Sequence, residues 1–481
     1  MTLETNDLRV EDGDAAGYPR WFSGAAFALA AAAVACAIHT RDGEYWPSAL
    51  KWVTVGLAFT VAGVALPHVR DPRGRGRSVL LGALAAALVF QFYQLLRSPP
   101  SGWNDWSNDL VDRRPENLRL YYAGVTSAAV LAAGLLLRDS RPMRNVCLPL
   151  LLGLHLCLGV WMIRSSPLPK IDVFAFQQIG GEALLAGRNP YAVEMPDIYH
   201  GTQQERDRAV YGHGLSEGGK LKFGFPYPPL SLYLSTLGYV AAGDHRYAQL
   251  VALTMAGAFI AWSRPGRVAA LAAVLLLFTP RAFFIIGRAW TEPFVVCMLA
   301  ATVFCACRGM RVLPIALGLL LASKQYLVFA LPAVFLLAPR RDLRGIAVLL
   351  GGALATAAVV SAPLVLWDWR AFVHSAGTVQ KLAPFRTDAL SYLVWMHNNR
   401  WGITPGVWMA FVAMAVGMVV ALWRSPRDAS GFAGAMALTF LPFIAFNKQA
   451  FANYYLLVIG ALCCAVAALP VVRKSEAASV R

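Results

Sequence analysis

Charged residues are scarce in this sequence. Only 15% of its 481 residues are Asp, Glu, Lys or Arg, whereas a water-soluble domain is about a quarter charged because its surface faces water. Hydrophobic residues make up 57% of the chain, and its mean hydropathy is +0.51. These values exclude an ordinary water-soluble enzyme and a disordered chain, and they indicate a protein that crosses a membrane several times.

The sequence also lacks the usual signatures of disulfide bonds and metal sites. All eight cysteines lie in apolar runs or at their ends, where a cysteine packs as a small apolar residue. The Cys305-x-Cys307 pair has no second pair at zinc spacing, and the eight histidines form no His-Glu-x-x-His motif. The sequence therefore predicts no disulfide and no zinc site, and we expect neither a metal nor a cofactor.

Apolar runs occupy most of the chain, and a membrane-spanning helix needs about 20 mostly apolar residues. About fourteen runs approach this length, at 21–39, 48–66, 79–96, 118–137, 145–163, 247–262, 268–280, 291–307, 311–323, 325–338, 345–366, 403–423, 430–446 and 452–472. The two runs between 311 and 338 form either a broken pair or one kinked helix. The sequence thus predicts an all-α membrane bundle of about fourteen transmembrane helices.

The basic residues indicate an orientation for this bundle. Lys and Arg outnumber Asp and Glu by 43 to 27, which gives a net charge of +16. Much of the excess lies in short alternate loops, at 70–77, 138–144, 264–267, 308–311, 340–344, 424–427 and 473–481. Short basic loops face the cytoplasm, so we predict a plasma membrane protein whose tails, 1–20 and 473–481, are cytoplasmic. No basic stripe with stacking aromatics lies outside the runs, so we expect no nucleic-acid partner.

Two longer loops lie on the outer side in this topology, at 164–246 and 367–402. The basic loops stay on one side only if residues 227–242 do not cross the membrane, so we predict an interfacial helix there. A proline at position 229 suits the start of this helix, and Gly243 suits its end.

Asp172 comes directly after an apolar run and begins a segment of helical periodicity that ends near Gly187. Taken alone, an acidic residue at a helix start is explained by the helix dipole. Two motifs follow it, however: Gly-Arg-Asn-Pro-Tyr at 187–191 and Tyr-Pro-Pro-Leu at 227–230. Because a span, an Asp, a helix and two motifs follow one another in this order, Asp172 is a candidate catalytic residue.

With these features in this order, the sequence resembles the GT-C glycosyltransferases, in particular the bacterial mannosyltransferase-like branch, glycosyltransferase family 87. The likeness continues through the stretches 286–292, 318–325 and 384–391. It lies within residues 141–472, which would form the catalytic module. The four apolar runs of residues 21–140 fall outside the likeness and look like an N-terminal addition.

The resemblance implies transfer of a single sugar on the outer face, from a polyprenyl-phosphate donor to a lipid or glycan acceptor. The sugar would be mannose or another hexose or pentose. The resemblance also implies that Asp172 is the general base, because the acceptor hydroxyl loses its proton as it attacks the anomeric carbon. The phosphate leaves without a proton, so one carboxylate is enough and the configuration inverts, unlike glycoside hydrolysis with its paired carboxylates.

The leaving phosphate needs cationic and hydrogen-bonding groups. The candidates for this role are Arg188, Arg288, Lys324, Arg386, Lys448 and Asn453. Charged residues at membrane depth are costly and are often functional, although a snorkelling side chain at a helix end is the structural alternative. Lys448 and Asn453 lie in the stretch 447–455, where related members often have a histidine that this chain lacks.

Five further residues are candidates for the substrate pocket: Asn189, Tyr191, Tyr227, Glu292 and Asp388. The structural alternative for the two tyrosines is anchoring at the membrane interface. For Glu292 the alternative is an ion pair with Arg288, four residues before it.

Two other functions share parts of this pattern. A transporter or flippase would place Lys324 and Lys448 along a polar path, and it would usually have internal repeats, of which the sequence gives no strong sign. A ligase or polymerase that moves whole lipid-linked glycans would share the acidic outer loop. A transferase is distinguished from a transporter by a cleft at Asp172 that is closed towards the cytoplasm.

Overall fold

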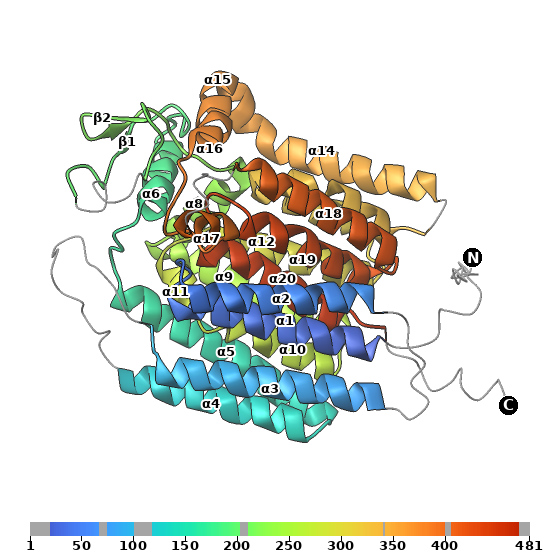
Figure 1. The fold of residues 1–481 in the computed structure, drawn as a ribbon. Helices are drawn as coiled ribbons and strands as arrows, with labels where there is room; N and C mark the ends of the chain where they lie inside the picture. Colours follow the sequence, from blue (N-terminus) through green and yellow to red (C-terminus); the bar gives the residue numbers. More distant parts are fainter. Residues whose placement is uncertain are drawn as a thin grey trace, which may run out of the picture.

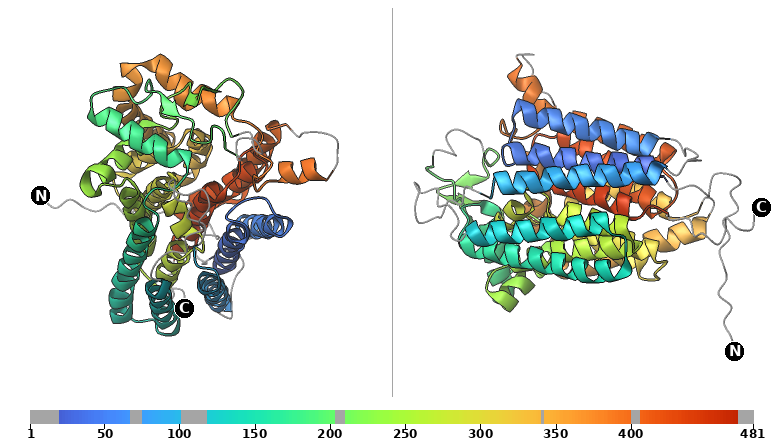
Figure 2. Two further views of the ribbon diagram at one scale, coloured as in Figure 1. Left: turned by 90° about the vertical axis from the view of Figure 1, so that its left-hand side faces the viewer. Right: turned by 90° about the horizontal axis from the view of Figure 1, so that it is seen from below.

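The computed structural model describes residues 20–66, 75–100, 118–202, 210–339, 342–399 and 406–470. Apart from Arg20, the two predicted tails lie outside these ranges. Helices make up most of the described chain, and the longer ones run side by side along one direction (Figures 1 and 2). All eight cysteines are free, as the sequence predicts.

Within the described residues, six helices are long and apolar enough to cross a membrane. They are α1 (Trp21–Thr40), α2 (Pro47–Ala65), α3 (Arg75–Arg97), α4 (Leu118–Leu137), α5 (Arg141–Ser165) and α14 (Leu343–Trp367). Several long apolar helices in one chain indicate a multi-pass membrane protein. The prediction of a helical membrane bundle is confirmed at this level.

Other helices, shorter or less apolar, lie on the remaining apolar runs. They are α9 (Arg246–Ser263), α10 (Arg267–Leu277), α12 (Glu292–Cys307), α13 (Leu313–Ser323), η1 (Gln325–Leu337), α18 (Trp408–Arg424), α19 (Ala429–Ala445) and α20 (Ala452–Ala467). Every residue of α19 is buried, and α20 is buried almost throughout, because these two helices pack between α1, α12 and α18. The number of fourteen crossings stays a prediction, since these helices are shorter than a typical span or contain more polar residues.

The region between 311 and 338 is a broken pair rather than one kinked helix. Lys324 has an extended backbone, with φ −156° and ψ 144°, and it separates α13 from η1. The 13 residues of η1 form a 3-10 helix. Because a 3-10 helix rises about 2.0 Å per residue, the 13 residues of η1 extend about 26 Å, about the length of a 17-residue α-helix.

Arginines of the predicted cytoplasmic loops contact the ends of helices. Arg424 donates a hydrogen bond to the carbonyl of Ala65 at the end of α2, over 2.6 Å. Arg308 donates to the carbonyl of Trp262 near the end of α9, over 2.8 Å. Because the last carbonyls of a helix have no partner within it, these arginines satisfy them. The opposite end of the bundle, at the left of Figure 1, carries the predicted outer loops.

Short helices form much of this opposite end. They are α6 (Asp172–Leu185), α8 (Pro229–Ala242), α11 (Ala282–Gly287), α15 (Trp369–Phe372), η2 (Val373–Thr378), α16 (Val379–Leu382) and α17 (Tyr392–Asn398). α6 begins at Asp172, as the sequence predicts, and α8 covers Pro229–Ala242 of the helix predicted at 227–242. Gly187 and Gly243 follow these two helices with φ of +66° and +75°, a left-handed conformation that only glycine adopts without strain.

A small antiparallel sheet lies between α6 and α8, where the sequence analysis predicted only helix and polar loop. Its strands β1 (Met195–Pro196), β2 (Ser216–Glu217) and β3 (Lys220–Leu221) are arranged in the order β1-β3-β2. Gly218 and Gly219 turn the chain between β2 and β3 with φ of +58° and +77°. Paired glycines with positive φ are typical of a two-residue hairpin turn, so the Gly-Gly dipeptide was a signal for this hairpin.

Candidate functional site

Asp172 lines a cavity of about 670 Å³ at the outer-loop end of the bundle. Several parts of the chain supply its walls: the connection between α1 and α2, the start of α6, the outer-loop residues Tyr199, Val210 and Tyr227, the segment around α11, and two stretches at 386–388 and 449–454. Among the described residues, no lining residue comes from the basic loops at the other end. The described walls of the cavity therefore all lie at the outer-loop end of the bundle.

The Asp172 carboxylate is held by its surroundings. Its Oδ1 accepts a hydrogen bond from the backbone N–H of Val173 over 2.8 Å. The Tyr211 hydroxyl donates to Oδ2 over 3.3 Å, and the Tyr199 hydroxyl accepts from the Asp172 backbone N–H over 3.4 Å. Burial raises the pKa of Asp172 above its ordinary value, while these hydrogen bonds and the charge of Arg386 act in the opposite direction. A carboxylate with a raised pKa is a stronger base.

Two predicted cations, Arg288 and Arg386, line the same cavity. Arg386 forms a bidentate ion pair with Asp388, with Nε–Oδ1 and Nη2–Oδ2 distances of 2.9 and 2.8 Å. Its guanidinium also lies 5.1 Å from the ring centroid of Phe451. Because Asp388 offsets part of the charge of Arg386, the net positive charge that faces Asp172 is smaller than the sequence suggested.

Asn453 offers an unused hydrogen-bonding group to this cavity. Its side chain is 4% exposed, and its Oδ1 has no hydrogen-bond partner within the described residues. A buried polar atom without a partner costs roughly 1–3 kcal/mol. A ligand in the cavity would supply that partner, so Asn453 is a natural contact for a bound molecule.

Lys324 and Lys448 line a second cavity of about 520 Å³. Lys324 is 5% exposed; its Nζ lies 2.9 Å from a carboxylate oxygen of Glu292 and donates to the Thr291 hydroxyl over 2.6 Å. The ammonium also lies 4.3 Å from the ring centroid of Tyr227. Glu292 begins α12, and it is paired with Lys324 across the bundle, whereas the sequence suggested Arg288 as its partner.

The second cavity is mainly apolar and meets the first. Tyr227, Gln449 and Tyr454 line both. Much of the remaining wall is aromatic and aliphatic, and two of its side chains, Val328 and Phe411, are 52% and 41% exposed on the side of the bundle. The polar cavity at Asp172 therefore continues into an apolar one that reaches the flank of the bundle.

Four predicted residues line neither cavity: Glu292, which contacts Lys324, and the motif residues Arg188, Asn189 and Tyr191. Arg188 is exposed beyond the end of α6, at the opposite end of the 14-residue helix that Asp172 begins. The Asn189 side chain accepts a hydrogen bond from the backbone N–H of Tyr191, and the Tyr191 hydroxyl donates to the carbonyl of Tyr227. The motif at 187–191 thus shapes the outer loop, and the structure gives these residues no contact with the cavities.

The connection between α1 and α2 contributes residues that the sequence analysis did not select. Arg41, Asp42 and Glu44 line the Asp172 cavity. Gly43 has φ +83°, and a Cβ on it would lie 2.4 Å from the backbone nitrogen of Ala452, so only glycine fits at this contact. The Asp-Gly pair after the first apolar run was the available signal. The first two helices are therefore part of the site.

Buried amides fix α6 relative to the segment that carries Arg288. The Gln177 side chain donates to the carbonyl of Ala289 over 2.5 Å, and Gln249 donates to the same carbonyl over 3.1 Å. Ser235 of α8 donates to the Gln177 amide oxygen over 2.6 Å. Ala289 has φ +58°, which is uncommon for a residue other than glycine. This network sets the position of Arg288 relative to α6, the helix that begins with Asp172.

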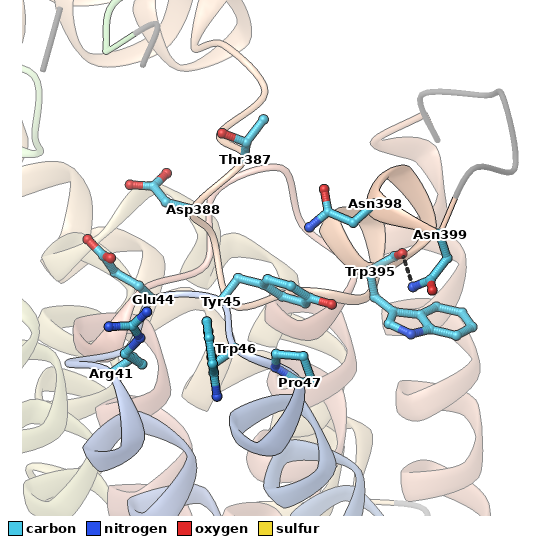
Figure 3. A pocket seen from close by; sticks show the side chains of 10 residues that line it. All are labelled: Arg41, Glu44, Tyr45, Trp46, Pro47, Thr387, Asp388, Trp395, Asn398 and Asn399. Atoms are coloured by element: carbon cyan, nitrogen blue, oxygen red, sulfur yellow. Dashed lines mark hydrogen bonds between the residues drawn. The ribbon is translucent and has the colours of Figure 1, made fainter. Parts of the chain in front are cut away.

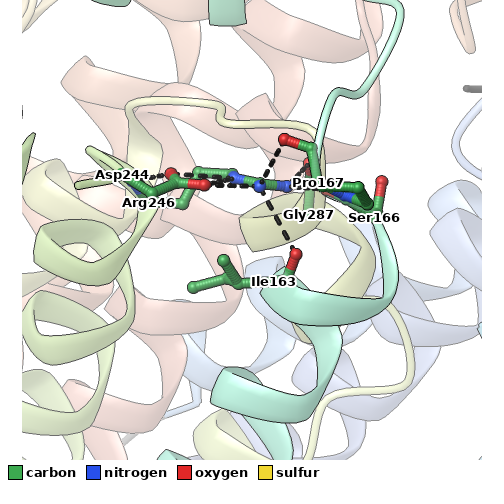
Figure 4. A network of polar contacts seen from close by, with 6 residues as sticks. All are labelled: Ile163, Ser166, Pro167, Asp244, Arg246 and Gly287. Atoms are coloured by element: carbon green, nitrogen blue, oxygen red, sulfur yellow. Dashed lines mark hydrogen bonds and ion pairs between the residues drawn. The ribbon is translucent and has the colours of Figure 1, made fainter. Parts of the chain in front are cut away.

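Arg246 joins the ends of three segments and is fully buried (Figure 4). Its guanidinium donates hydrogen bonds to the carboxylate of Asp244 and to the carbonyls of Ile163, Ser166, Pro167 and Gly287. Two of these carbonyls lie near the end of α5 and one closes α11. The residue therefore holds together the chain that leads to Asp172 and the chain that leads to Arg288.

Comparisons of the chain with protein-family models, curated proteins and solved structures find no match. Within the described ranges, no group of three or more His, Cys, Asp or Glu side chains is arranged to hold a metal ion.

Proposed function

We propose that this protein is a membrane glycosyltransferase of the GT-C type. It moves one sugar from a polyprenyl-phosphate donor to an acceptor hydroxyl, with Asp172 as the general base and inversion at the anomeric carbon. The observation that carries the proposal is the position of Asp172. A carboxylate with a raised pKa lies in a polar cavity that also holds two arginines and meets an apolar cavity at a common wall.

The two cavities suit the two parts of such a donor. The sugar occupies the polar cavity, and the polyprenyl chain lies in the apolar cavity and leaves through its exposed flank. The phosphate lies near their common wall, between Arg288 of the first cavity and the lysines of the second. Lys448 donates to the carbonyls of Lys381 and Ala383, and all three residues line the apolar cavity.

The reaction takes place in one displacement. Asp172 accepts the proton of the acceptor hydroxyl as its oxygen bonds to the anomeric carbon. The bond from that carbon to the phosphate oxygen breaks, and the polyprenyl phosphate leaves with the electron pair. The cations stabilise the negative charge that develops on the phosphate. The tyrosines around Asp172 stay protonated, because burial raises the pKa of Tyr199 and of Tyr211.

The same proposal includes an orientation. The basic loops face the cytoplasm, and the site lies on the outer face of the plasma membrane. A transporter or flippase needs a polar path between both sides, whereas the described lining residues of the Asp172 cavity come from one end of the bundle. This observation favours the transferase.

Purified protein offered a panel of polyprenyl-phosphate sugars tests the proposal. The wild type should transfer a sugar from one donor class, and Asp172→Asn should lower the rate about 10²- to 10⁴-fold, the range for loss of a general base. Glu194→Gln is the matched control, because Glu194 is an exposed carboxylate in the same outer loop. Substantial transfer by Asp172→Asn contradicts the role of Asp172, and no transfer by the wild type from any donor contradicts the proposed function.

A further inference from the structure

A third cavity, of about 820 Å³, lies beside the one at Asp172 (Figure 3). Arg41, Glu44 and Asp388 line both cavities, so the two share a wall. In Figure 3, Glu44 and Asp388 lie on one side of the cavity, and Trp395 and two asparagines lie on the other. The side chains between them belong to the connection between α1 and α2.

The third cavity combines flat apolar surfaces with amides and carboxylates. Trp46 and Trp395 are 47% and 37% exposed, so their rings are accessible. The side chains of Asn398 and Asn399 are exposed as well. An amide offers both hydrogen-bond donors and an acceptor, and an indole ring offers a wide, rigid apolar face. Sugar rings need this combination, because each has an apolar C–H face and a rim of hydroxyl groups.

Backbone contacts hold the cavity in shape without a ligand. The backbone N–H of Tyr45 donates to the carbonyl of Asp388 over 2.8 Å, and Glu44 and Ala389 form an isolated antiparallel bridge. The segment that leads to the opposite wall is held as well, because the backbone N–H of Leu390 donates to the carbonyl of Ala450 over 2.7 Å. A preformed site binds with a smaller entropy cost than a site that must be ordered.

We propose that this cavity binds a carbohydrate acceptor and delivers one of its hydroxyl groups to Asp172. The inference rests on the proposed function and deepens it, because it commits the acceptor to a glycan or to the glycan headgroup of a lipid. The acceptor sugar rests against Trp46 and Trp395, and the reacting sugar passes Glu44 and Asp388 into the Asp172 cavity. The first two helices, outside the family resemblance, thereby contribute to the choice of acceptor.

Binding of soluble disaccharides to the detergent-solubilised full chain tests the inference without requiring transfer. Mannobiose, cellobiose and maltose are the probes, and saturation-transfer NMR measures their affinity. At least one disaccharide should bind to the wild type. Trp395→Ala should lower the affinity for it about tenfold, and so should Asn398→Ala, which removes a smaller side chain. Trp369→Ala is the control for Trp395→Ala, because Trp369 is an exposed tryptophan of the same outer loop that lines none of the three cavities.

The outcomes separate the two proposals. If no disaccharide binds, or if Trp395→Ala and Asn398→Ala bind as tightly as the wild type, the acceptor site is wrong and the aromatic side chains only anchor the protein at the membrane interface. If a disaccharide binds at this cavity but the wild type consumes no polyprenyl-phosphate sugar, the proposed function is wrong. Thermal unfolding of each variant shows that a loss of binding does not reflect a loss of folding.

Discussion

At the scale of single residues, the protonation of Asp172 controls the proposed reaction. Burial raises the pKa of its carboxyl above the ordinary value of 3.8. A general base must be deprotonated to act, so the transfer rate should fall as the pH is lowered through this raised pKa. A profile of kcat/KM against pH should therefore show an acid limb whose midpoint lies above pH 3.8. Glu194→Gln should keep that limb, and any residual activity of Asp172→Asn should lack it.

The same shift determines how Asp172 affects stability. A carboxyl whose pKa is higher in the folded chain binds more protons there, so ionising it at neutral pH weakens folding. Asp172→Asn removes that cost, and its thermal unfolding midpoint at pH 7 should equal or exceed that of the wild type. An acid limb that persists in Asp172→Asn, or a clearly lower midpoint, would contradict this account of the carboxylate.

The sequence predicts some residues of the site and not others, for a physical reason. Asp172 and Arg386 flank recognisable motifs, and the structure brings both to one cavity. In the sequence, Arg188 and Arg288 were both candidates as cations for the phosphate. The structure separates Arg188 from Asp172 by the length of α6. Arg41 and Glu44 reach the cavity because α1 packs against α20, a contact between distant parts of the chain. Periodicity within a segment contains no information about such a contact.

At the scale of elements, Arg246 provides the clearest test of how α5 and α11 are held. Arg246→Met leaves the Asp244 carboxylate without its guanidinium partner and removes hydrogen bonds from the carbonyls at the ends of both helices. Breaking a buried ion pair in this way costs about 3–5 kcal/mol. The free energy of unfolding of the detergent-solubilised protein should fall by that amount, and transfer should fall with it.

Arg164→Met is the control for this prediction, because Arg164 is an exposed arginine in the last turn of α5. It should change the free energy of unfolding by less than about 0.5 kcal/mol, as surface substitutions usually do. Equal effects of the two variants would show that Arg246 does not hold these helix ends.

The elements themselves were largely predictable, because apolar runs and helix caps are local signals. Asp172 and Pro229 mark the starts of α6 and α8, and glycines mark their ends. The hairpin of β2 and β3 was missed because strands of two residues have no measurable alternation. The short helices α15 and α16 were missed for a similar reason, since they have only four residues each.

At the scale of the whole molecule, the proposed function makes a prediction about metal ions. In the proposal, the phosphate of the donor faces arginine and lysine side chains, which supply positive charge without a divalent cation. We therefore expect that EDTA leaves the transfer rate unchanged. Assays with EDTA, and then with added magnesium or manganese, check this expectation. A loss of transfer in EDTA that either ion restores would contradict it.

The connection between α1 and α2 limits how far the chain can be shortened. Gly43 fits against Ala452 at the start of α20, and Asp42 forms an ion pair with Arg281 over 2.6 Å. A truncated variant that begins at Arg141 would expose the faces of α20 and α10 that α1 and α3 cover. It would also remove Arg41, Asp42 and Glu44 from the wall of the Asp172 cavity. A shortened chain that keeps this wall intact therefore has to retain α1, α2 and the connection between them.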